Sequence, residues 1–219
     1  MIYLLTALIL FLMPGCKEAT PAVQPSPPIV QTPALLPTQI PRSVLKYRNG
    51  LIREVRYHWG LNQSPSVFFA QVHQESAWRA DAHSAYAAGL TQFTPDTAEW
   101  IQSLYPADLT EFCANRSGCP LDAGWAIRAM VLYDRRLWDG FAHSIDDHRW
   151  AFALASYNGG LGWIQRERAQ AQKRHIDPEF WFGAVEAVCL RAQWACAENR
   201  QYPRRILFVW RPVYEGWLS

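Results

Sequence analysis

One carboxylate stands among large apolar side chains in the segment that follows Ser64. Phe68, Val72 and Glu75 are spaced by four and three residues, so on a helix Glu75 shares a face with two hydrophobic side chains. Burial disfavours the charged form of a carboxyl group and raises its pKa, and a raised pKa suits a general acid that works near neutral pH. A buried Glu that pairs with an Arg is the structural alternative. The spacing therefore makes Glu75 a candidate catalytic acid.

A metal-dependent reaction is a second kind of chemistry to consider, because His73 and Glu75 form a His-x-Glu pair as in zinc deaminases. That signature requires a Pro-Cys-x-x-Cys partner, and the sequence contains none. Neither of the two close cysteine pairs has C-x-x-C spacing, and no His lies close to either pair. We therefore expect no metal and no other cofactor.

Three ordered motifs resemble those of the soluble lytic transglycosylase domain, a family related to goose-type lysozyme. The first contains a Glu-Ser pair, a later Ser and a Gly-Leu-x-Gln turn with a nearby Pro; here these are Glu75-Ser76, Ser84, residues 89–92 and Pro95. Ala-Ser-Tyr-Asn-Gly-Gly at 155–160 is similar to the family's Ala-x-Tyr-Asn-Ala-Gly. Asn-Arg-Gln-Tyr-Pro-Arg-Arg-Ile at 199–206 is similar to its Thr-Arg-x-Tyr-x-x-x-Ile element. The resemblance covers about residues 50–210.

The chain departs from the family pattern in three ways. It has one residue fewer between Ser84 and Gly89, Ala87-Ala88 in place of the usual Gly-Ala, and Gly159 where Ala is more common. Two of these departures fall in the loop before Gln92.

The resemblance implies that Glu75 is the sole catalytic acid/base in cleavage of the β-1,4 bond between N-acetylmuramic acid and N-acetylglucosamine. Glu75 would protonate the leaving oxygen and then accept the proton of the muramoyl 6-hydroxyl, which closes onto C1 as a 1,6-anhydro sugar. Ordinary glycosidases use a second carboxylate to attack the sugar or activate water. The nearest acids after Glu75, Asp81 and Asp96, are not at helical spacing from it, and Asp81 is expected to be a solvated loop acid.

The resemblance implies substrate-binding roles for five further residues. Ser76 and Gln92 would hydrogen-bond catalytic or sugar groups, Tyr157 would orient Glu75, and Asn158 and Tyr202 would line the cleft. Three have structural alternatives: Tyr157 as a core residue, Asn158 as a helix C-cap and Tyr202 as an aromatic residue that starts a helix. Two other functions remain open for the whole chain, namely a non-catalytic peptidoglycan-binding protein and a lysozyme-like hydrolase.

The elements that must position these residues are predicted to be helices almost throughout from residue 43. Apolar periodicity, N-cap signals such as Thr94-Pro95 and glycine stops such as Gly60 support this prediction. No alternating run is long enough for a substantial sheet. We expect an all-α, lysozyme-like domain over 43–219, with loops near 79–93 and 105–120 lining a substrate cleft. The predicted helices are 44–58, 64–78, 94–104, about 121–138, 144–159, 161–173, 178–190 and 203–211.

The segment before residue 43 has the composition of an export signal followed by a tether. Residues 1–15 carry no charged side chain and lead into Gly15-Cys16, so we expect a lipoprotein-type signal peptide and lipidation of Cys16. An ordinary signal peptide with an incidental Cys16 and a short uncleaved anchor are the alternatives. Residues 16–42 hold seven of the chain's 15 prolines and should form an extended spacer. The protein is then expected in the cell envelope, facing the periplasm and anchored in a membrane.

Four cysteines lie beyond Cys16: Cys113, Cys119, Cys189 and Cys196. An even number behind an export signal indicates two disulfides, for which three connectivities exist. We favour the two local pairs. On one continuous helix Cys189 and Cys196 would be about 10 Å apart, so a local bridge there requires a helix end between them.

The composition of the chain favours some classes of binding partner over others. A net charge of +2 is too small to favour nonspecific nucleic-acid binding, and half of the residues are hydrophobic, as a folded domain requires. The 30 aromatic residues (11 Trp, 9 Tyr and 10 Phe) suit a groove that binds sugar rings. We expect peptidoglycan glycan strands as the partner and no nucleic acid. Wall turnover, secretion or conjugation machinery, and a phage are all compatible settings.

Overall fold

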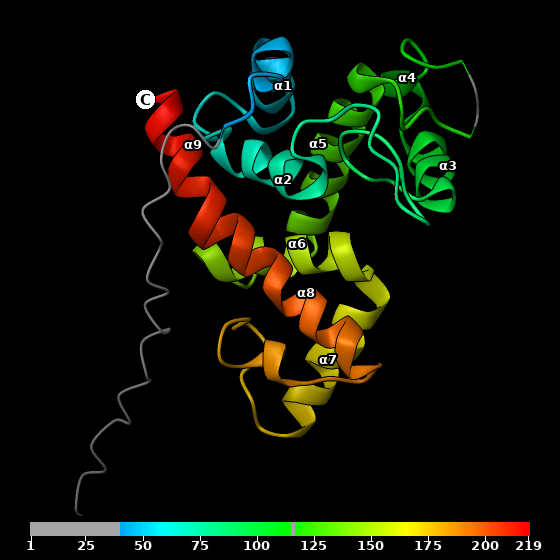
Figure 1. Cartoon of the computed structure of the whole chain (residues 1–219). Coiled ribbons are helices and arrows are strands. Elements are labelled where there is room, and N and C mark those ends of the chain that lie inside the picture. Colours follow the sequence, from blue (N-terminus) through cyan, green and yellow to red (C-terminus); the bar gives the residue numbers. More distant parts are fainter. Residues whose placement is uncertain (1–39, 115–116) are drawn as a thin grey trace, which may run out of the picture.

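A computed structural model describes residues 40–114 and 117–219 (Figure 1). The expected signal peptide, Cys16 and most of the spacer lie outside these residues. Within the described chain all extended regular elements are helices, and the only β-type pairings are isolated bridges from Ala88 to His83 and to Phe93. None of the described helices is both long and apolar enough to span a membrane. The expected all-α fold is confirmed for the described residues.

The helices match the expected ranges closely over the first three quarters of the domain. Thr94 caps its helix as predicted, because its side chain accepts a hydrogen bond from the backbone N–H of Thr97. Ser64 does not occupy the predicted cap position, since the helix begins at Ser66. The elements are α1 (Val44–Trp59), α2 (Ser66–Ser76), α3 (Pro95–Leu104), α4 (Pro106–Leu109), α5 (Ala123–Asp139), α6 (Asp146–Gly159), α7 (Leu161–Lys173), the 3₁₀ turn η2 (Val185–Ala187), α8 (Gln193–Arg205), the π-helical η3 (Ile206–Trp210) and α9 (Arg211–Leu218).

The prediction of a helix over 178–190 is wrong. The segment is a series of turns with the short η2 inside it, and Gly183 adopts a left-handed φ of 73°. Trp181, Val185 and Val188 have helical spacing and are all buried, so the turns place them in the core without a continuous helix. Apolar spacing alone did not distinguish the two arrangements.

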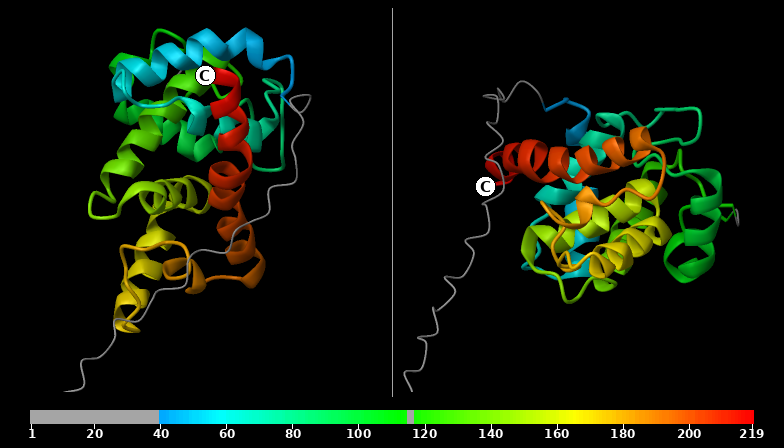
Figure 2. Two further views of the ribbon diagram at one scale, coloured as in Figure 1. Left: turned by 90° about the vertical axis from the view of Figure 1, so that its left-hand side faces the viewer. Right: turned by 90° about the horizontal axis from the view of Figure 1, so that it is seen from below.

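The expected helix over 203–211 is part of a longer rod. α8, η3 and α9 follow one another without a break from Gln193 to Leu218 and run across the molecule, orange to red in Figures 1 and 2. Pro203 lies inside α8 and Pro212 in the first turn of α9, and each lacks the N–H that a helix normally uses. Between them the N–H of Arg211 bonds the carbonyl of Ile206, which makes the π-helical turn.

Two helices form the interior. α6 is surrounded by α5, α7 and α8, and every residue from Trp150 to Ser156 is buried. α2 packs against η3 and α9 and is buried from Ser66 to His73. A helix that is enclosed on all sides is held rigidly. The C-terminal ends of α2 and α6 therefore provide fixed positions for side chains that face solvent.

Both expected local disulfides are present. Cys113 pairs with Cys119 and Cys189 with Cys196, each with a Cα–Cα distance of 5.9 Å. α8 begins at Gln193, between Cys189 and Cys196, so the required helix end separates the second pair. The first bridge closes the loop before α5, and the second fixes the entry of the chain into α8.

Candidate active site

Glu75 lies in the last turn of α2, where the helix is ended by two residues in left-handed conformations. Ala77 has φ 48° and Trp78 has φ 65°. The indole of Trp78 is buried, and its Nε1 donates a hydrogen bond of 2.7 Å to the hydroxyl of Tyr214 on α9. This buried contact holds the chain in its turn, so Glu75 projects from a firmly fixed helix end.

The carboxyl of Glu75 is partly buried and receives a hydrogen bond from the hydroxyl of Tyr202 on α8. Burial raises the pKa of Glu75 to about 8, against the lowering effect of the Tyr202 hydrogen bond, and the nearby carboxylate of Glu198 also raises it. None of the ion pairs among the described residues involves Glu75. The alternative of a structural ion pair with an Arg is therefore wrong for Glu75, and its raised pKa favours the protonated form at neutral pH.

Two cavities meet at Glu75. One has a volume of about 200 Å³ and the other about 110 Å³, and both are lined by Glu75 and Asn158. The first is completed by Gln74, Glu198, Gln201, Tyr202 and Arg205, and the second by Gln92, Phe93, Thr94, Thr97, Tyr133 and Tyr157. An extended ligand that occupies both would pass directly over the carboxyl group. Glu75 is thus placed to act on a bond near the middle of such a ligand.

The predicted site residues are brought together only in part. Gln92, Tyr157, Asn158 and Tyr202 all line these cavities. Ser76 does not: it is buried, and its hydroxyl donates to the carbonyl of Val72 in its own helix. Among the described residues Ser76 therefore makes no hydrogen bond to Glu75, because its side chain turns back along α2, and its contact with a sugar stays a prediction.

The expectation that Tyr157 orients Glu75 also needs correction. The hydroxyl of Tyr157 donates to the carbonyl of Thr91 at 2.8 Å, and Tyr202 is the residue that bonds Glu75. Tyr202 reaches the carboxyl because α8 passes beside the end of α2, whereas Tyr157 faces the loop that carries Gln92. Tyr157 thus supports the wall of the smaller cavity.

Gln92 fixes the loop that the sequence predicted beside the cleft. Its side-chain amide donates to the carbonyls of Ala82 and Gly89 at 3.2 and 2.9 Å. Gly89 has φ 79°, and a Cβ there would lie 1.8 Å from the carbonyl oxygen of Pro120. The loops 79–93 and 105–120 therefore touch at a point where only glycine fits.

The end of α6 is tied to α8 by a polar network. The side-chain amide of Asn199 donates to the Ala155 carbonyl at 2.8 Å and to the Asn158 side chain at 3.0 Å. A Cβ on Gly159 would come within 2.5 Å of Asn199 and 2.6 Å of Arg191. An Ala at 159 would therefore require the Asn199 and Arg191 side chains to shift. The hydrogen bond from Asn199 holds the side chain of Asn158, which lines both cavities.

Three acidic or phenolic residues near the site were missed by the sequence reasoning. Glu198 is exposed in the larger of the two cavities, Tyr133 lines the smaller, and Asp134 is fully buried on α5. Glu198 precedes Tyr202 by four residues, a helical spacing that became visible only once α8 was known. Asp134 follows Met130 by four residues and precedes Leu137 by three, so on a helix it shares a face with two hydrophobic side chains, as Glu75 does.

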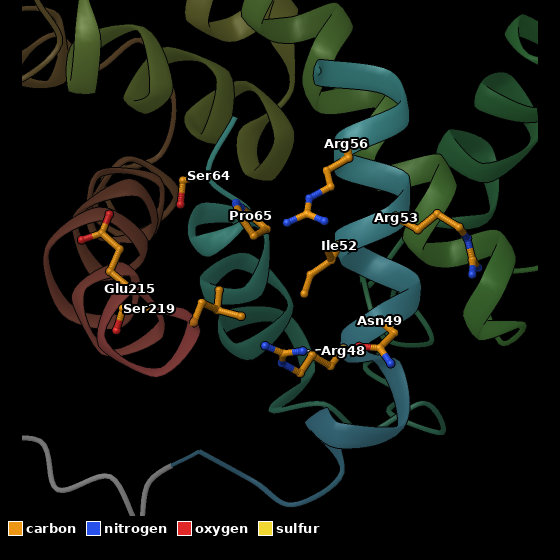
Figure 3. A pocket seen from close by; sticks show the side chains of 10 residues that line it. Arg48, Asn49, Ile52, Arg53, Arg56, Ser64, Pro65, Glu215 and Ser219 are labelled. Atoms are coloured by element: carbon orange, nitrogen blue, oxygen red, sulfur yellow. Dashed lines mark hydrogen bonds between the residues drawn. The ribbon is translucent and has the colours of Figure 1, made fainter. Parts of the chain in front are cut away.

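A larger cavity of about 680 Å³ lies elsewhere, between α1 and α9. Figure 3 shows Arg48 and Arg56 reaching from α1 toward it on either side of Ile52, while Arg53 points to the other side of the helix. It contains none of the predicted site residues. Residues 40–114 and 117–219 also contain no cluster of three His, Cys, Asp or Glu side chains that could hold a metal ion.

Comparison with known proteins identifies the family of the region that carries Glu75. The family described as Transglycosylase SLT domain matches residues 55–180, which include Glu75, Gln92 and Asn158. A membrane-bound lytic murein transglycosylase F from Shewanella denitrificans is 31% identical over 114 residues, and one from Marinobacter nauticus is 34% identical over 124 residues. These segments are 51% and 55% of this chain but only 20% and 22% of the relatives. Because the family match spans more than half of the sequence, the chain belongs to the transglycosylase SLT domain family.

Proposed function

We propose that the protein is a lytic transglycosylase that cleaves the β-1,4 bond between N-acetylmuramic acid and N-acetylglucosamine in peptidoglycan. The observation that carries the proposal is the position of the Glu75 carboxyl, which is hydrogen-bonded by Tyr202 and lines two adjoining cavities, where burial raises its pKa to about 8. An acid that keeps its proton at neutral pH can protonate a leaving oxygen. The two relatives named as lytic murein transglycosylases support murein, a peptidoglycan, as the substrate.

In the proposed reaction Glu75 donates its proton to the glycosidic oxygen as the bond from that oxygen to C1 breaks. The muramoyl 6-hydroxyl then attacks C1, with help from the substrate's acetamido group, and gives its proton to the Glu75 carboxylate. One C–O bond breaks and one forms, no water is consumed, and Glu75 returns to its protonated state. The product carries a 1,6-anhydro-muramic acid end.

A hydrolase of the same fold is the second candidate, and Glu198 is the observation that favours it. A hydrolase needs a second carboxylate to activate water or to attack the sugar, and Glu198 shares a cavity with Glu75. Glu198 is exposed, however, and its pairing with Glu75 is a charge interaction rather than a hydrogen bond. The internal hydroxyl of the substrate makes this second acid unnecessary.

Mass spectrometry of muropeptides released by the purified protein tests the product. We expect anhydro ends from the wild type and from Glu198→Gln, because neither step above uses Glu198. Asp81→Asn is the matched control, since Asp81 is exposed in a loop and lines neither cavity. If the wild type released products with reducing ends and Glu198→Gln did not, the protein would be a hydrolase that uses Glu198. No release at all would indicate a peptidoglycan-binding protein without catalysis.

We further propose that Cys16 carries a lipid and that residues 16–42 tether the domain to a membrane. The uncharged segment ending at Gly15-Cys16, the proline-rich spacer and the membrane-bound relatives support this proposal. Wild-type protein should sediment with membranes after cell breakage, and Cys16→Ser should be found in the soluble fraction or remain unprocessed. Wild-type protein in the soluble fraction would contradict the anchor and leave the enzymatic proposal unaffected.

A further inference from the structure

A second buried carboxyl lies behind the site and has no cationic partner. Asp134 on α5 and Gln71 on α2 are both 0% exposed, and the side-chain amide nitrogen of Gln71 donates to Asp134 Oδ1 at 3.3 Å. The other oxygen of each side chain, Asp134 Oδ2 and Gln71 Oε1, is buried without a hydrogen-bond partner. The two side chains thus share one hydrogen bond and leave one unpaired oxygen each.

One proton on Asp134 would provide a donor for the two unpaired oxygens. An ionised carboxylate and an amide oxygen are both acceptors and cannot bond each other, whereas a neutral carboxylic acid has an O–H to donate. A neutral acid and a primary amide can form two hydrogen bonds, N–H to one carboxyl oxygen and O–H to the amide oxygen. Leaving both oxygens unpaired and a charge buried would destabilise the fold.

The groups around Asp134 offer no charge that would keep it ionised. The ion pairs of the described residues do not include Asp134. The titratable groups that interact with it are Glu75 from α2, Tyr133 on its own helix, Tyr157 from α6 and Tyr202 from α8. Burial holds the pKa of Asp134 well above its usual value against the lowering effect of the Gln71 hydrogen bond, and Glu75 raises it further where that carboxyl ionises.

We propose that Asp134 is a neutral carboxylic acid joined to Gln71 by two hydrogen bonds, and that this pair positions Glu75 by locking α2 to α5. Gln71 precedes Glu75 by four residues, so the lock lies one helical turn from the carboxyl and on the same face of α2. The inference rests on the proposed function for the catalytic role of Glu75, but the protonation of Asp134 does not depend on it. Asp134 and Gln71 are positioning residues, because both are fully buried and neither lines the two cavities at Glu75.

Asp134→Asn is the informative substitution. An Asn side chain has nearly the shape of the neutral acid and can form the same two hydrogen bonds with Gln71, but it cannot ionise. The comparison is best made in protein that already carries Glu75→Gln, since residue 75 then cannot ionise and cannot alter the titration of residue 134. Any difference in pH dependence between the two proteins arises from Asp134 alone.

The first measurement is the unfolding equilibrium constant between pH 5 and pH 7, for Glu75→Gln protein with Asp134 or with Asp134→Asn. In the unfolded chain Asp134 ionises with an ordinary pKa near 4. If it stays protonated in the fold, the folded state binds one more proton than the unfolded state and stability falls as pH rises. We expect the unfolding constant with Asp134, divided by that with Asp134→Asn, to rise about tenfold per pH unit. A ratio that stays constant over this range would overturn the proposal.

Infrared spectroscopy gives a result even if the Asp134→Asn protein does not fold. Folded Glu75→Gln protein at pH 7 should show the carbonyl band of a protonated carboxylic acid. Gln71→Leu removes the amide partner and should shift that band, because the acid loses its hydrogen bonds. Absence of the band would show an ionised Asp134 and would contradict the proposal.

The positioning role is tested by cleavage of peptidoglycan. Asp134→Asn should cleave peptidoglycan within about threefold of the wild-type rate, and its activity should decline at the same pH as that of the wild type. Asp134→Leu should lose tenfold or more in cleavage rate, because a small displacement of a catalytic group is costly. Asp134→Leu protein that folds and cleaves like the wild type would refute the positioning role. If the cleavage activity of Asp134→Asn declined at a lower pH than that of the wild type, Asp134 would have to be charged in the wild-type protein. If the wild type itself does not cleave, the proposed function fails, and the unfolding and infrared results still decide the state of Asp134.

Discussion

Two glutamates that are withdrawn from water have opposite environments in this molecule. Glu54 lies where α1 packs on α5, and Arg128 binds it through two nitrogens at 2.8 and 3.2 Å. Glu75 lies at the end of α2, where its hydrogen-bond partner is the neutral hydroxyl of Tyr202. Burial by itself raises the pKa of Glu54, but bonds and charges from His58 and Arg128 lower it to about 2. The pKa of Glu75 is raised to about 8.

The difference shows that burial alone does not define a catalytic acid. Glu54 forms the kind of structural ion pair with an Arg that the sequence analysis considered as an alternative for Glu75. Arg128 also bonds Glu111 and the carbonyl of Asp108, and it thereby joins α1, α4 and α5. A carboxyl with a bidentate Arg stays ionised and cannot donate a proton. The absence of such a cation keeps Glu75 protonated and available for chemistry.

Glu54→Gln should produce the largest loss of stability. The substitution removes the buried charge partner of Arg128 and leaves only the exposed Glu111, so we expect a loss of about 3 kcal/mol, the lower end of the cost of breaking a buried ion pair. Glu54 has a depressed pKa, so its contribution is present above pH 4.5 and is lost as pH falls toward 2. Urea unfolding of the wild type and the variant at pH 7 and pH 3 should show a difference that shrinks in acid. An equal difference in unfolding free energy at pH 7 and pH 3 would contradict the ion pair between Glu54 and Arg128.

Reduction of the two disulfides should destabilise the protein without affecting either glutamate. A native bridge is typically worth about 2–5 kcal/mol, and these loops of six and seven residues should fall at the lower end. Thermal unfolding should shift down by several degrees on addition of reductant. Four titratable thiols in the native, oxidatively purified protein would show that the bridges do not form.

Glu75→Gln should stabilise the protein at neutral pH, opposite in sign to Glu54→Gln. In the unfolded chain Glu75 ionises near pH 4.5, whereas in the fold it holds its proton up to about pH 8. This mismatch destabilises the wild type as pH rises from 4.5 to 8, by about 1–3 kcal/mol at pH 7. Urea unfolding should find the variant more stable at pH 7 and equal to the wild type near pH 4. A variant less stable at pH 7 would mean that Glu75 is charged in the fold.

Much of this arrangement is visible in the sequence. The helical periodicity of α1, α3, α5, α6 and α7, the two local disulfides and the acid on the apolar face of α2 were all predicted, because each depends on residues close together in the chain. The structure of residues 174–202 was not predicted correctly, since buried turns and helices share the same apolar spacing. Pro203, which suggested a helix start, lies inside α8.

The contacts between helices could not be predicted in the same way. The hydrogen bond from Tyr202 to Glu75 joins residues 127 positions apart, and it exists because α8 passes the end of α2. The turn of Ser76 back toward Val72 and the bond from Tyr157 to Thr91 likewise depend on how the helices pack. Motifs identified which residues gather at the site, and packing decided which of them touch Glu75.

The rate at which Glu75→Gln releases anhydro-muropeptides tests the central claim most directly. The substitution keeps the shape of the side chain and removes its proton, and general acid/base groups typically account for about 10²–10⁴-fold in rate. Glu54→Gln is the matched control, because it changes a buried glutamate away from both cavities. We expect Glu75→Gln to bind sedimented peptidoglycan as the wild type does while release falls at least a hundredfold, and folded Glu54→Gln to release muropeptides at nearly the wild-type rate. A Glu75→Gln protein that cleaves within tenfold of the wild type would contradict the claim that this carboxyl is the catalytic acid.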